Sequence, residues 1–254
     1  MPRENNINSN HTNFNTIAST YGETITDTKK HITLPLFKKI LGDVNGKRVA
    51  DLGCGDGFFT RIIATEKPLS IVGIDIAEKL IEKSIQREQQ EQKGILYQCK
   101  DIRSLEKKEC FELITAVYLL NFAMTKEDLF IMLQSTYNNL NKNGKFCAII
   151  PHPKIKLTSG FELGRKIYPN SKNDTFSDGD KVEYRIGNER KNIHIIYYYW
   201  SKETYENCLR KAGFTRIEWQ EPTISPEAIA LFGKEYWSNY QQNPSSIGLI
   251  CWKD

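Results

Sequence analysis

The sequence predicts an α/β protein: a doubly wound, mostly parallel sheet of seven strands, with an inserted lid that contains a β-hairpin. Three features support this fold class. Short apolar runs alternate with amphipathic segments over residues 48–150, a glycine-rich loop follows the first apolar run, and the alternation breaks after Pro151 before it resumes at Lys202. Strands and helices that alternate at this spacing are joined by right-handed crossovers, which build a parallel sheet.

The individual elements follow from local patterns in chain order. A helix is expected within residues 24–41, because apolar residues recur there at helical spacing: Leu34, Phe37, Ile40 and Leu41. We then expect strands at 48–52, 70–75, 95–99, 111–119, 145–150, 214–221 and 247–252, with helices that start near residue 58 and cover 77–92, 126–140 and 202–212. The run 111–119 is apolar throughout, as expected of a strand that is buried on both faces.

The chain is expected to form one domain with an insertion. Residues 1–20 are polar and Asn-rich and should form a flexible tail, whereas 21–254 should form the domain. Within it, residues 152–200 interrupt the alternation and are expected to form a lid over the substrate. Its first part, up to residue 180, has the composition of a loop, and strands at 181–186 and 192–200 should form a hairpin.

The composition excludes several classes of protein. Of the 254 residues 39% are apolar and 26% charged, as in soluble globular domains. The net charge of +4 is spread along the helices, without the basic face typical of nucleic-acid-binding proteins, and no apolar run is long enough to span a membrane. None of the six cysteines forms a C-x-x-C pair. We therefore expect a cytoplasmic protein with reduced thiols, no metal, nucleic-acid or membrane partner, acting as a monomer or homodimer.

The strongest local signal is the segment Val49-Ala50-Asp51-Leu52-Gly53-Cys54-Gly55-Asp56-Gly57. Glycines at alternate positions between a strand and a helix allow the backbone to approach a ligand closely. A dinucleotide-binding loop needs G-x-G-x-x-G, and here the third glycine comes one residue too early. Asp51 and Asp56 would also repel a diphosphate, whereas they suit the cationic amino group of a methionine moiety. The loop therefore favours S-adenosylmethionine (SAM) over NAD.

Two further carboxylates follow the next strands. Asp75 ends the second strand, where an acidic residue can accept hydrogen bonds from ribose hydroxyls. Asp101 follows the third strand and could accept from the exocyclic amine of adenine, with Ile76 and Ile102 packed on the ring. The alternative for each single Asp is a turn former or helix cap.

Residues 48–150 resemble the class I SAM-dependent methyltransferases, which have a Rossmann-like fold. VADLGCGDG is similar to their first motif, IVGIDIAEKLI to the second, CKDIRSL to the third-strand motif and FELITAVYLLNFA to the segment that borders cofactor and substrate. The resemblance implies the following cofactor-binding residues: Asp51, Gly53 and Gly55 for the methionine part, Asp75 for the ribose, Asp101 and Ile102 for the adenine, and Tyr118 beside the methyl group. We also expect Cys54, between the two glycines, to contact the cofactor. Tyr21 resembles the N-terminal tyrosine that helps to close the site in small-molecule members. TAVYLLNFA and KEYWSNYQQNPSSIGLICWKD are most similar to the toxoflavin-type azapteridine N-methyltransferases.

The acceptor is expected to be a small planar heteroaromatic or quinone-like molecule. The turn after the fourth strand lacks the N/D-P-P-Y/F motif of enzymes that methylate DNA bases or glutamine, and the lid is rich in aromatic residues. We expect Tyr197, Tyr199, Trp200 and Asn121 to contact the substrate; the alternative is that these rings only pack on the sheet.

Methyl transfer from a sulfonium mainly requires alignment and exclusion of water. Tyr118 and His152 are the candidate catalytic residues, with His194 a weaker candidate for a base, although positioning alone can suffice for an acidic ring nitrogen. Three alternatives remain: a methyltransferase acting on RNA or protein, a SAM-binding protein without catalysis, and an NAD-dependent oxidoreductase.

Overall fold

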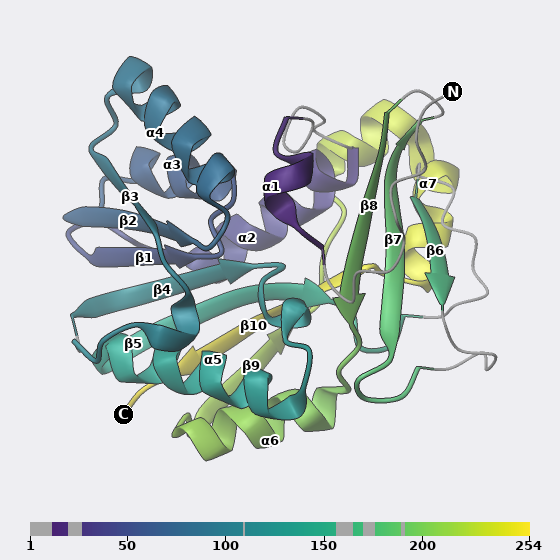
Figure 1. Cartoon of the computed structure of the whole chain (residues 1–254). Helices are drawn as coiled ribbons and strands as arrows, with labels where there is room; N and C mark the ends of the chain where they lie inside the picture. Colours follow the sequence, from purple (N-terminus) through teal and green to yellow (C-terminus); the bar gives the residue numbers. More distant parts are fainter. Residues whose placement is uncertain (1–11, 20–26, 109, 156–164, 170–175, 189–190) are drawn as a thin grey trace.

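The computed structural model describes residues 12–19, 27–108, 110–155, 165–169, 176–188 and 191–254. The predicted fold class is confirmed (Figure 1). A seven-stranded sheet has the strand order β3-β2-β1-β4-β5-β10-β9, in which β3, β2, β1, β4 and β5 are parallel and β10 runs antiparallel to both of its neighbours. These strands are β1 (Arg48–Leu52), β2 (Ser70–Asp75), β3 (Ile95–Cys99), β4 (Phe111–Val117), β5 (Leu140–Pro151), β9 (Arg216–Gln220) and β10 (Ser246–Trp252).

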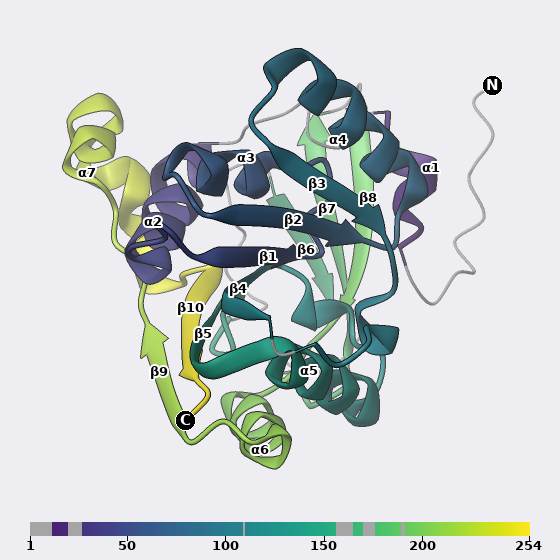
Figure 2. The same ribbon diagram turned by 90° about the vertical axis from the view of Figure 1, so that its left-hand side faces the viewer.

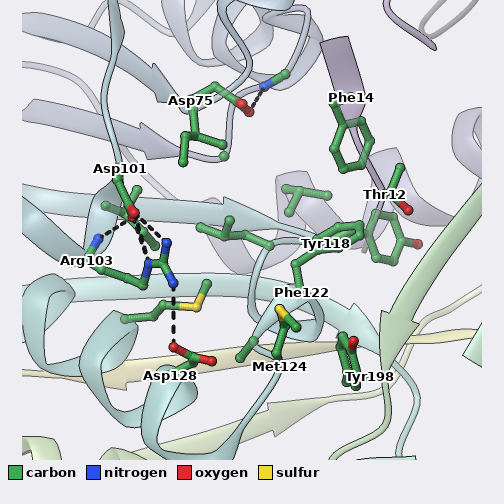
Figure 3. A pocket seen from close by; sticks show the side chains of 18 of the residues that line it. Thr12, Phe14, Asp75, Asp101, Arg103, Tyr118, Phe122, Met124, Asp128 and Tyr198 are labelled. Carbon is green, nitrogen blue, oxygen red and sulfur yellow. Dashed lines mark hydrogen bonds and ion pairs between the residues drawn. The ribbon is translucent and has the colours of Figure 1, made fainter. Parts of the chain in front are cut away.

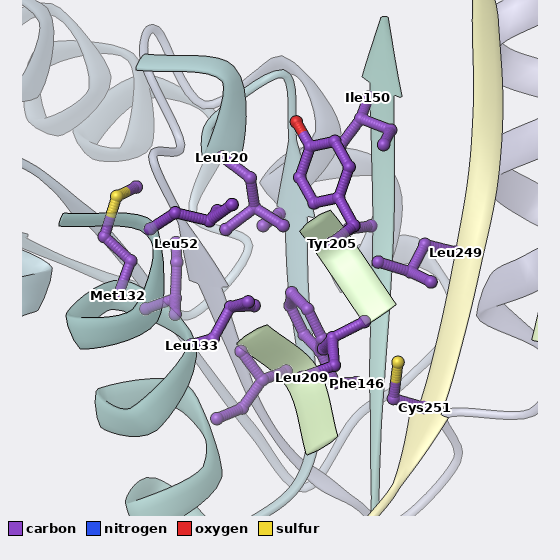
Figure 4. Packing of buried hydrophobic residues seen from close by; sticks show 14 of the residues in the cluster. Leu52, Leu120, Met132, Leu133, Phe146, Ile150, Tyr205, Leu209, Leu249 and Cys251 are labelled. Atoms are coloured by element: carbon purple, nitrogen blue, oxygen red, sulfur yellow. The ribbon is translucent and has the colours of Figure 1, made fainter. Parts of the chain in front are cut away.

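Helices cover both faces of this sheet (Figure 2). One core cluster joins one face of the sheet to α2 (Leu34–Leu41), α3 (Phe58–Thr65) and α4 (Glu78–Glu91). The other cluster joins the opposite face to α5 (Lys126–Asn139) and α6 (Lys202–Ala212) (Figure 4). Alternate residues of β5 enter different clusters: Phe146 and Ala148 face α5 and α6, whereas Cys147 and Ile149 face α2. Because both faces of this central strand are buried, its sequence is continuously apolar over these residues.

The helix ends have local causes in the sequence. Thr125 caps α5 by accepting a hydrogen bond from the Asp128 N–H at 3.0 Å, and Ser201 caps α6 in the same way through the N–H of Thr204. Gly213 ends α6 in the left-handed conformation, with φ of 116°. The start of α5 matters for the site, because it lies next to the ends of β3 and β4.

The inserted segment, for which we keep the name lid, contributes a separate antiparallel sheet with the order β6-β7-β8 (Figure 1). The hairpin of β7 (Lys181–Asn188) and β8 (Lys191–Tyr198) confirms the expected pair of strands. The expectation of a loop up to residue 180 is wrong for β6 (Arg165–Pro169), which pairs with β7 from Val182 to Ile186. This strand depends on the edge supplied by the next strand, β7, so the pattern within residues 165–169 does not reveal it.

Two further elements lie outside the sequence-based assignment. Helix α7 (Pro226–Gln242) is interrupted at Gly233 and packs Trp237 and Tyr240 against Ile32, which lies in the π-helix η1 (Lys29–Thr33) directly before α2. The short helix α1 (Phe14–Ile17) falls in the segment expected to be a tail, yet Phe14 and Ala18 pack against the start of α4. In the described part of the chain, no helix combines the length and apolarity needed to cross a membrane.

Candidate functional site

The carboxyl ends of β1, β2, β3 and β4 surround a cavity of about 260 Å³ (Figure 3). The structure brings seven of the ten residues expected to bind cofactor into its lining: Gly53, Gly55, Asp75, Ile76, Asp101, Ile102 and Tyr118. Tyr21 lies outside the described residues. Asp51 and Cys54 are buried below the lining.

The glycine loop is shaped by left-handed backbone conformations. Gly53 and Gly55 have φ of 64° and 57°, and Gly57 starts α3 with φ of 72°. A Cβ on Gly53 would lie 2.8 Å from Cδ1 of Leu119, so the loop and the turn after β4 are in close contact. Only glycine satisfies both the conformation and this approach.

Asp75 ties the glycine loop to the end of β2. Its carboxylate accepts a hydrogen bond from the N–H of Gly55 and another from the N–H of Ala77, each at 2.8 Å. Burial raises the pKa of Asp75 above the usual value of an aspartate, and the two N–H groups oppose this shift. The same carboxylate borders the cavity and can accept hydrogen bonds from a ligand.

Asp51 does not reach the cavity, contrary to the expectation of direct contact. The residue is 2% exposed, and its two oxygens accept hydrogen bonds from Thr60 at 2.6 Å and Thr115 at 2.7 Å. Burial raises the pKa of Asp51 to about 6. The charge of the Asp51 carboxylate therefore acts on the glycine loop from the buried side, without direct contact with the cavity.

Cys54 is also directed inward. Its sulfur packs against Gly73, where a Cβ would come within 3.0 Å of it. Burial raises the pKa of this thiol well above its usual value, which keeps it protonated and unreactive. Cys54 therefore contributes to the glycine loop through its backbone between Gly53 and Gly55, and not through its side chain.

Beyond the end of β3, Arg103 bonds to Asp101. Its guanidinium donates to both carboxylate oxygens, with distances of 2.6 to 3.1 Å, and approaches Asp128 at the start of α5 to 3.5 Å (Figure 3). This pairing lowers the pKa of Asp101 below its usual value. Both Arg103 and Asp128 line the cavity and were missed from the sequence, although the spacing of Asp101 and Arg103 was a possible signal.

Tyr118 ends β4 in a left-handed conformation with φ of 54°. This conformation is unusual for a bulky residue, and it stops the strand two residues before the expected end. The N–H of Tyr118 donates to the carbonyl of Ile149 at 2.7 Å, and its hydroxyl lies 3.3 Å from that of Thr33. The aromatic ring thereby enters the cavity.

Beyond Tyr118 the cavity wall is apolar. It is formed by residues from α1, from the turn around the 3-10 helix η3 (Leu120–Phe122) and from β8: Phe14, Phe122, Met124, Ile196 and Tyr198. Thr12 joins two of these elements, because its hydroxyl bonds to both the N–H and the carbonyl of Ile196.

A family model described as a methyltransferase domain matches residues 43–213, about two thirds of the chain. The chain belongs to this methyltransferase domain family. The match covers the glycine loop, the ends of β2, β3 and β4, and both strands of the lid hairpin.

Two curated relatives of this methyltransferase are O-methyltransferases. It is 37% identical over 78 residues to a ubiquinone biosynthesis O-methyltransferase of Coxiella burnetii, a match that spans 30% of the chain and only 33% of that relative. It is 29% identical over 245 residues to a malonyl-[acyl-carrier protein] O-methyltransferase of Bacillus cereus, covering 89% of each chain.

Solved structures share the fold of this methyltransferase. A SAM-dependent methyltransferase of Mesorhizobium loti superposes with a TM-score of 0.63 at 19% identity, covering 86% of this chain and 96% of the other. The CcbJ methyltransferase of Streptomyces caelestis gives a TM-score of 0.66 at 13% identity, covering 97% of this chain and all of the other. The prediction of SAM as cofactor is confirmed at the level of the family.

The cavity of the methyltransferase fits this cofactor. Gly53 and Gly55 of the glycine loop line it, and the carboxylates of Asp75 and Asp101 offer acceptors at two successive strand ends. Ile76 is 61% exposed, which is unusual for an isoleucine and leaves its side chain available to pack on a flat ring. Among the described residues, no group of three or more His, Cys, Asp or Glu side chains could hold a metal ion.

The residues expected to contact substrate lie outside this lining. Tyr197 and Trp200 are buried, the hydroxyl of Tyr199 donates to the carbonyl of Pro153 at 2.6 Å, and Trp200 Nε1 donates to the carbonyl of Ala123 at 3.2 Å. Asn121 is 3% exposed. The face of β8 that borders the cavity carries Ile196 and Tyr198 instead, because alternate residues of a strand point to opposite sides.

The position of His152 contradicts its expected role as a base in this cavity. The ring is 4% exposed, and Nδ1 accepts a hydrogen bond from the N–H of Lys154 at 3.0 Å. Nε2 lies 3.1 Å from the carboxylate of Glu221, to which it can donate. Burial lowers the pKa of His152, so the ring is neutral with both nitrogens engaged. These bonds join the residue after β5 to Lys154 and to Glu221, which directly follows β9.

Proposed function

We propose that this protein transfers a methyl group from SAM to a small, planar and largely apolar acceptor. The observation that supports this is the continuity of one cavity from the carboxylates of Asp75 and Asp101, past Tyr118, to the apolar wall formed with Phe14 and Tyr198. A polar nucleoside end and an apolar end joined in this way suit a cofactor and a flat acceptor side by side.

The proposed roles follow from position. The glycine loop holds the methionine part, Asp75 accepts from the ribose hydroxyls, and Asp101 accepts from the exocyclic amine of adenine. Ile76 and Ile102 pack on the two faces of the base. The buried charge of Asp51 favours the cationic methionine end through the loop.

The chemistry requires little beyond alignment. When bound, SAM supplies a methyl group on a sulfonium that is already a good leaving group. This methyl group would pass to an acceptor oxygen or nitrogen that has already lost its proton to solvent, with S-adenosylhomocysteine as the leaving product. Tyr118 borders the reacting end, and the apolar wall excludes water, which strengthens the interactions that orient the acceptor.

A malonyl-[acyl-carrier protein] acceptor is the second candidate, favoured by the relative that covers 89% of the chain. Such an acceptor presents a carboxylate, which requires a cation nearby. The charged residues in the described lining gather at the adenine end, as Asp75, Lys100, Asp101, Arg103 and Asp128, and the described apolar wall contributes none. The wall therefore favours a neutral ring, and azapteridines of the toxoflavin type, quinols and catechols are the compounds that we propose.

Transfer of label from methyl-labelled SAM tests this function. The panel comprises an azapteridine, a hydroquinone, a catechol, malonyl-acyl carrier protein, and bulk RNA and protein. We expect label in a ring compound alone. Label in the carrier protein or in a macromolecule would replace our acceptor class, and SAM binding without any transfer would indicate a non-catalytic binding protein.

A variant pair tests the apolar wall itself. Tyr198→Ala removes a ring that borders the cavity, and we expect the acceptor KM to rise about tenfold with the SAM KM unchanged. Tyr199→Phe is the matched control, because its hydroxyl bonds to Pro153 outside the cavity lining. An equal effect of both variants on the acceptor KM would assign the change to the lid fold and not to contact with the acceptor.

A further inference from the structure

Three charged side chains form a bridge across the adenine end of the cavity. Arg103 lies between Asp101, which follows β3, and Asp128, in the first turn of α5 (Figure 3). Asp101 is held in two ways, since one of its oxygens also accepts from the backbone N–H of Arg103 at 2.9 Å. All three residues line the cavity.

The bridge restricts how the carboxylate of Asp101 can turn. A guanidinium that donates to both oxygens fixes the plane of the carboxylate, whereas a free aspartate rotates about its last torsion. Asp128 is itself anchored, because its carboxylate accepts from the hydroxyl of Thr125 at 3.0 Å. The orientation of Asp101 is therefore set by the start of α5 as well as by β3.

We propose that Arg103 is a positioning residue that orients Asp101 as a hydrogen-bond acceptor, so that the cavity selects a 6-aminopurine over a 6-oxopurine. This inference rests on the adenine-binding role assigned to Asp101 in the proposed function. A fixed carboxylate accepts from an exocyclic amine, but it meets a carbonyl oxygen as acceptor against acceptor. Arg103 acts through Asp101 and needs no contact with the base.

The ion pair by itself contributes little to stability. The side chains of Arg103 and Asp101 are 47% and 29% exposed, and surface pairs of this kind are weak because solvent screens them. A bridge that fixes an acceptor inside a cavity affects ligand selectivity far more than unfolding. A change in ligand selectivity without a change in stability therefore distinguishes a positioning role of Arg103 from a structural one.

Calorimetry with two ligands tests the inference without any methyl acceptor. The probes are S-adenosylhomocysteine and S-inosylhomocysteine, which differ in the amine or carbonyl at position 6 of the base. We expect the wild-type protein to bind the amino ligand at least about tenfold more tightly. Arg103→Met should weaken the amino ligand about tenfold and the oxo ligand less than about twofold. Arg103→Lys should fall between, since an ammonium cannot make the paired contact.

Two further variants complete the test. Arg87→Met removes an exposed pair with Glu91 on α4, at 2.9 Å, and should leave both affinities unchanged. Asp101→Asn introduces amide donors and should shift the preference toward the oxo ligand. The proposal is overturned if folded Arg103→Met keeps the wild-type ratio, if it weakens both ligands in proportion, or if Asp101→Asn leaves the ratio unchanged. Absence of methyl transfer to the acceptor panel would contradict the proposed acceptor class and leave these binding ratios intact.

Discussion

The hydroxyl of Tyr118 lies 3.3 Å from the hydroxyl of Thr33, so the end of β4 is bonded to the π-helix that precedes α2. Both partners are in rare backbone conformations. Tyr118 has φ of 54°, and π-helical turns are rare and frequently lie at functional sites. A left-handed conformation costs a bulky residue about 1 to 2 kcal/mol, which surrounding contacts must offset. The contact with Thr33 and the bond to Ile149 hold the ring in the cavity.

Removing either hydroxyl should show this coupling. Thr33→Val and Tyr118→Phe each delete one partner with little change in volume, and each should lower the free energy of unfolding by about 1 kcal/mol. The free energy of unfolding of the double variant should be no lower than that of the less stable single variant, because both substitutions remove the same hydrogen bond. Urea unfolding of the four proteins measures the cycle. Strictly additive losses would mean that the two hydroxyls do not interact.

Gly53 and Gly46 form a matched pair for testing the glycine loop. Both have positive φ, at 64° and 69°, but a Cβ on Gly53 would collide with Leu119, whereas nothing lies within 4 Å of one on Gly46. Gly46→Ala should lose about 1 kcal/mol of stability from backbone strain alone and bind S-adenosylhomocysteine normally. Gly53→Ala should lose more than about 2 kcal/mol and most of its affinity.

Calorimetric titration and urea unfolding of both variants separate strain from collision. If Gly53→Ala binds S-adenosylhomocysteine as well as Gly46→Ala does, the close approach of the loop to the turn after β4 has no part in the binding site.

Asp51 should make stability fall as pH rises. Burial raises its folded pKa to about 6 from 3.8, so between these values the folded state holds the proton more tightly than the unfolded state. Its favourable contribution is complete below about pH 3.8 and is lost as pH rises through about 6, a change of about 3 kcal/mol. Asp51→Asn removes this dependence, because an amide does not titrate.

Urea unfolding of wild type and Asp51→Asn at intervals from pH 4 to 7 gives the difference curve. We expect the wild type to lose stability relative to the variant across this window. Parallel curves would show that Asp51 has an ordinary pKa in the folded protein. S-adenosylhomocysteine is expected to reduce the difference, since its cationic amino group favours the ionised carboxylate.

Strand ends were the part of the site that the sequence could predict. Gly53, Asp75 and Asp101 follow apolar runs whose order fixes their place at one edge of a parallel sheet, so local pattern and topology place them together. The side-chain face of β8 could not be predicted in this way. Aromatic residues occupy both faces of this strand, and the choice of Tyr198 over Tyr197 depends on how the lid docks.

Long-range partners account for the other differences. Arg103 joins the site because the start of α5 brings Asp128 beside it, and β6 forms because β7 offers an edge. Helix α7 contains Gly233 with a positive, non-helical φ of 81°, which breaks the helical period, and Trp237 of this helix is buried against η1. The contacts of Arg103 with Asp128, of β6 with β7 and of Trp237 with η1 join residues that lie more than ten positions apart, so no short window of sequence reveals them.

His152 should act through stability and not as a base. Both ring nitrogens bond within the protein, so His152→Ala leaves the buried N–H of Lys154 without its acceptor, and we expect a loss of about 1 to 3 kcal/mol. Burial lowers the folded pKa below 6.5, against the opposing effect of Glu221. The contribution of the neutral ring is therefore present above about pH 6.5 and is lost as pH falls, so the cost of the variant should be larger at pH 8 than at pH 5.

Urea unfolding at the two pH values tests this dependence, and the pH profile of methyl transfer tests the absence of a catalytic role. Glu221→Gln is the control: the side chain of Glu221 is 64% exposed and the amide oxygen still accepts from Nε2, so stability should change by less than about 0.5 kcal/mol. Our proposal assigns the rate to positioning and not to proton transfer, so we expect the profile of His152→Ala to keep the wild-type shape. A variant as stable as wild type, whose turnover collapses and recovers at high pH, would instead restore His152 as the base.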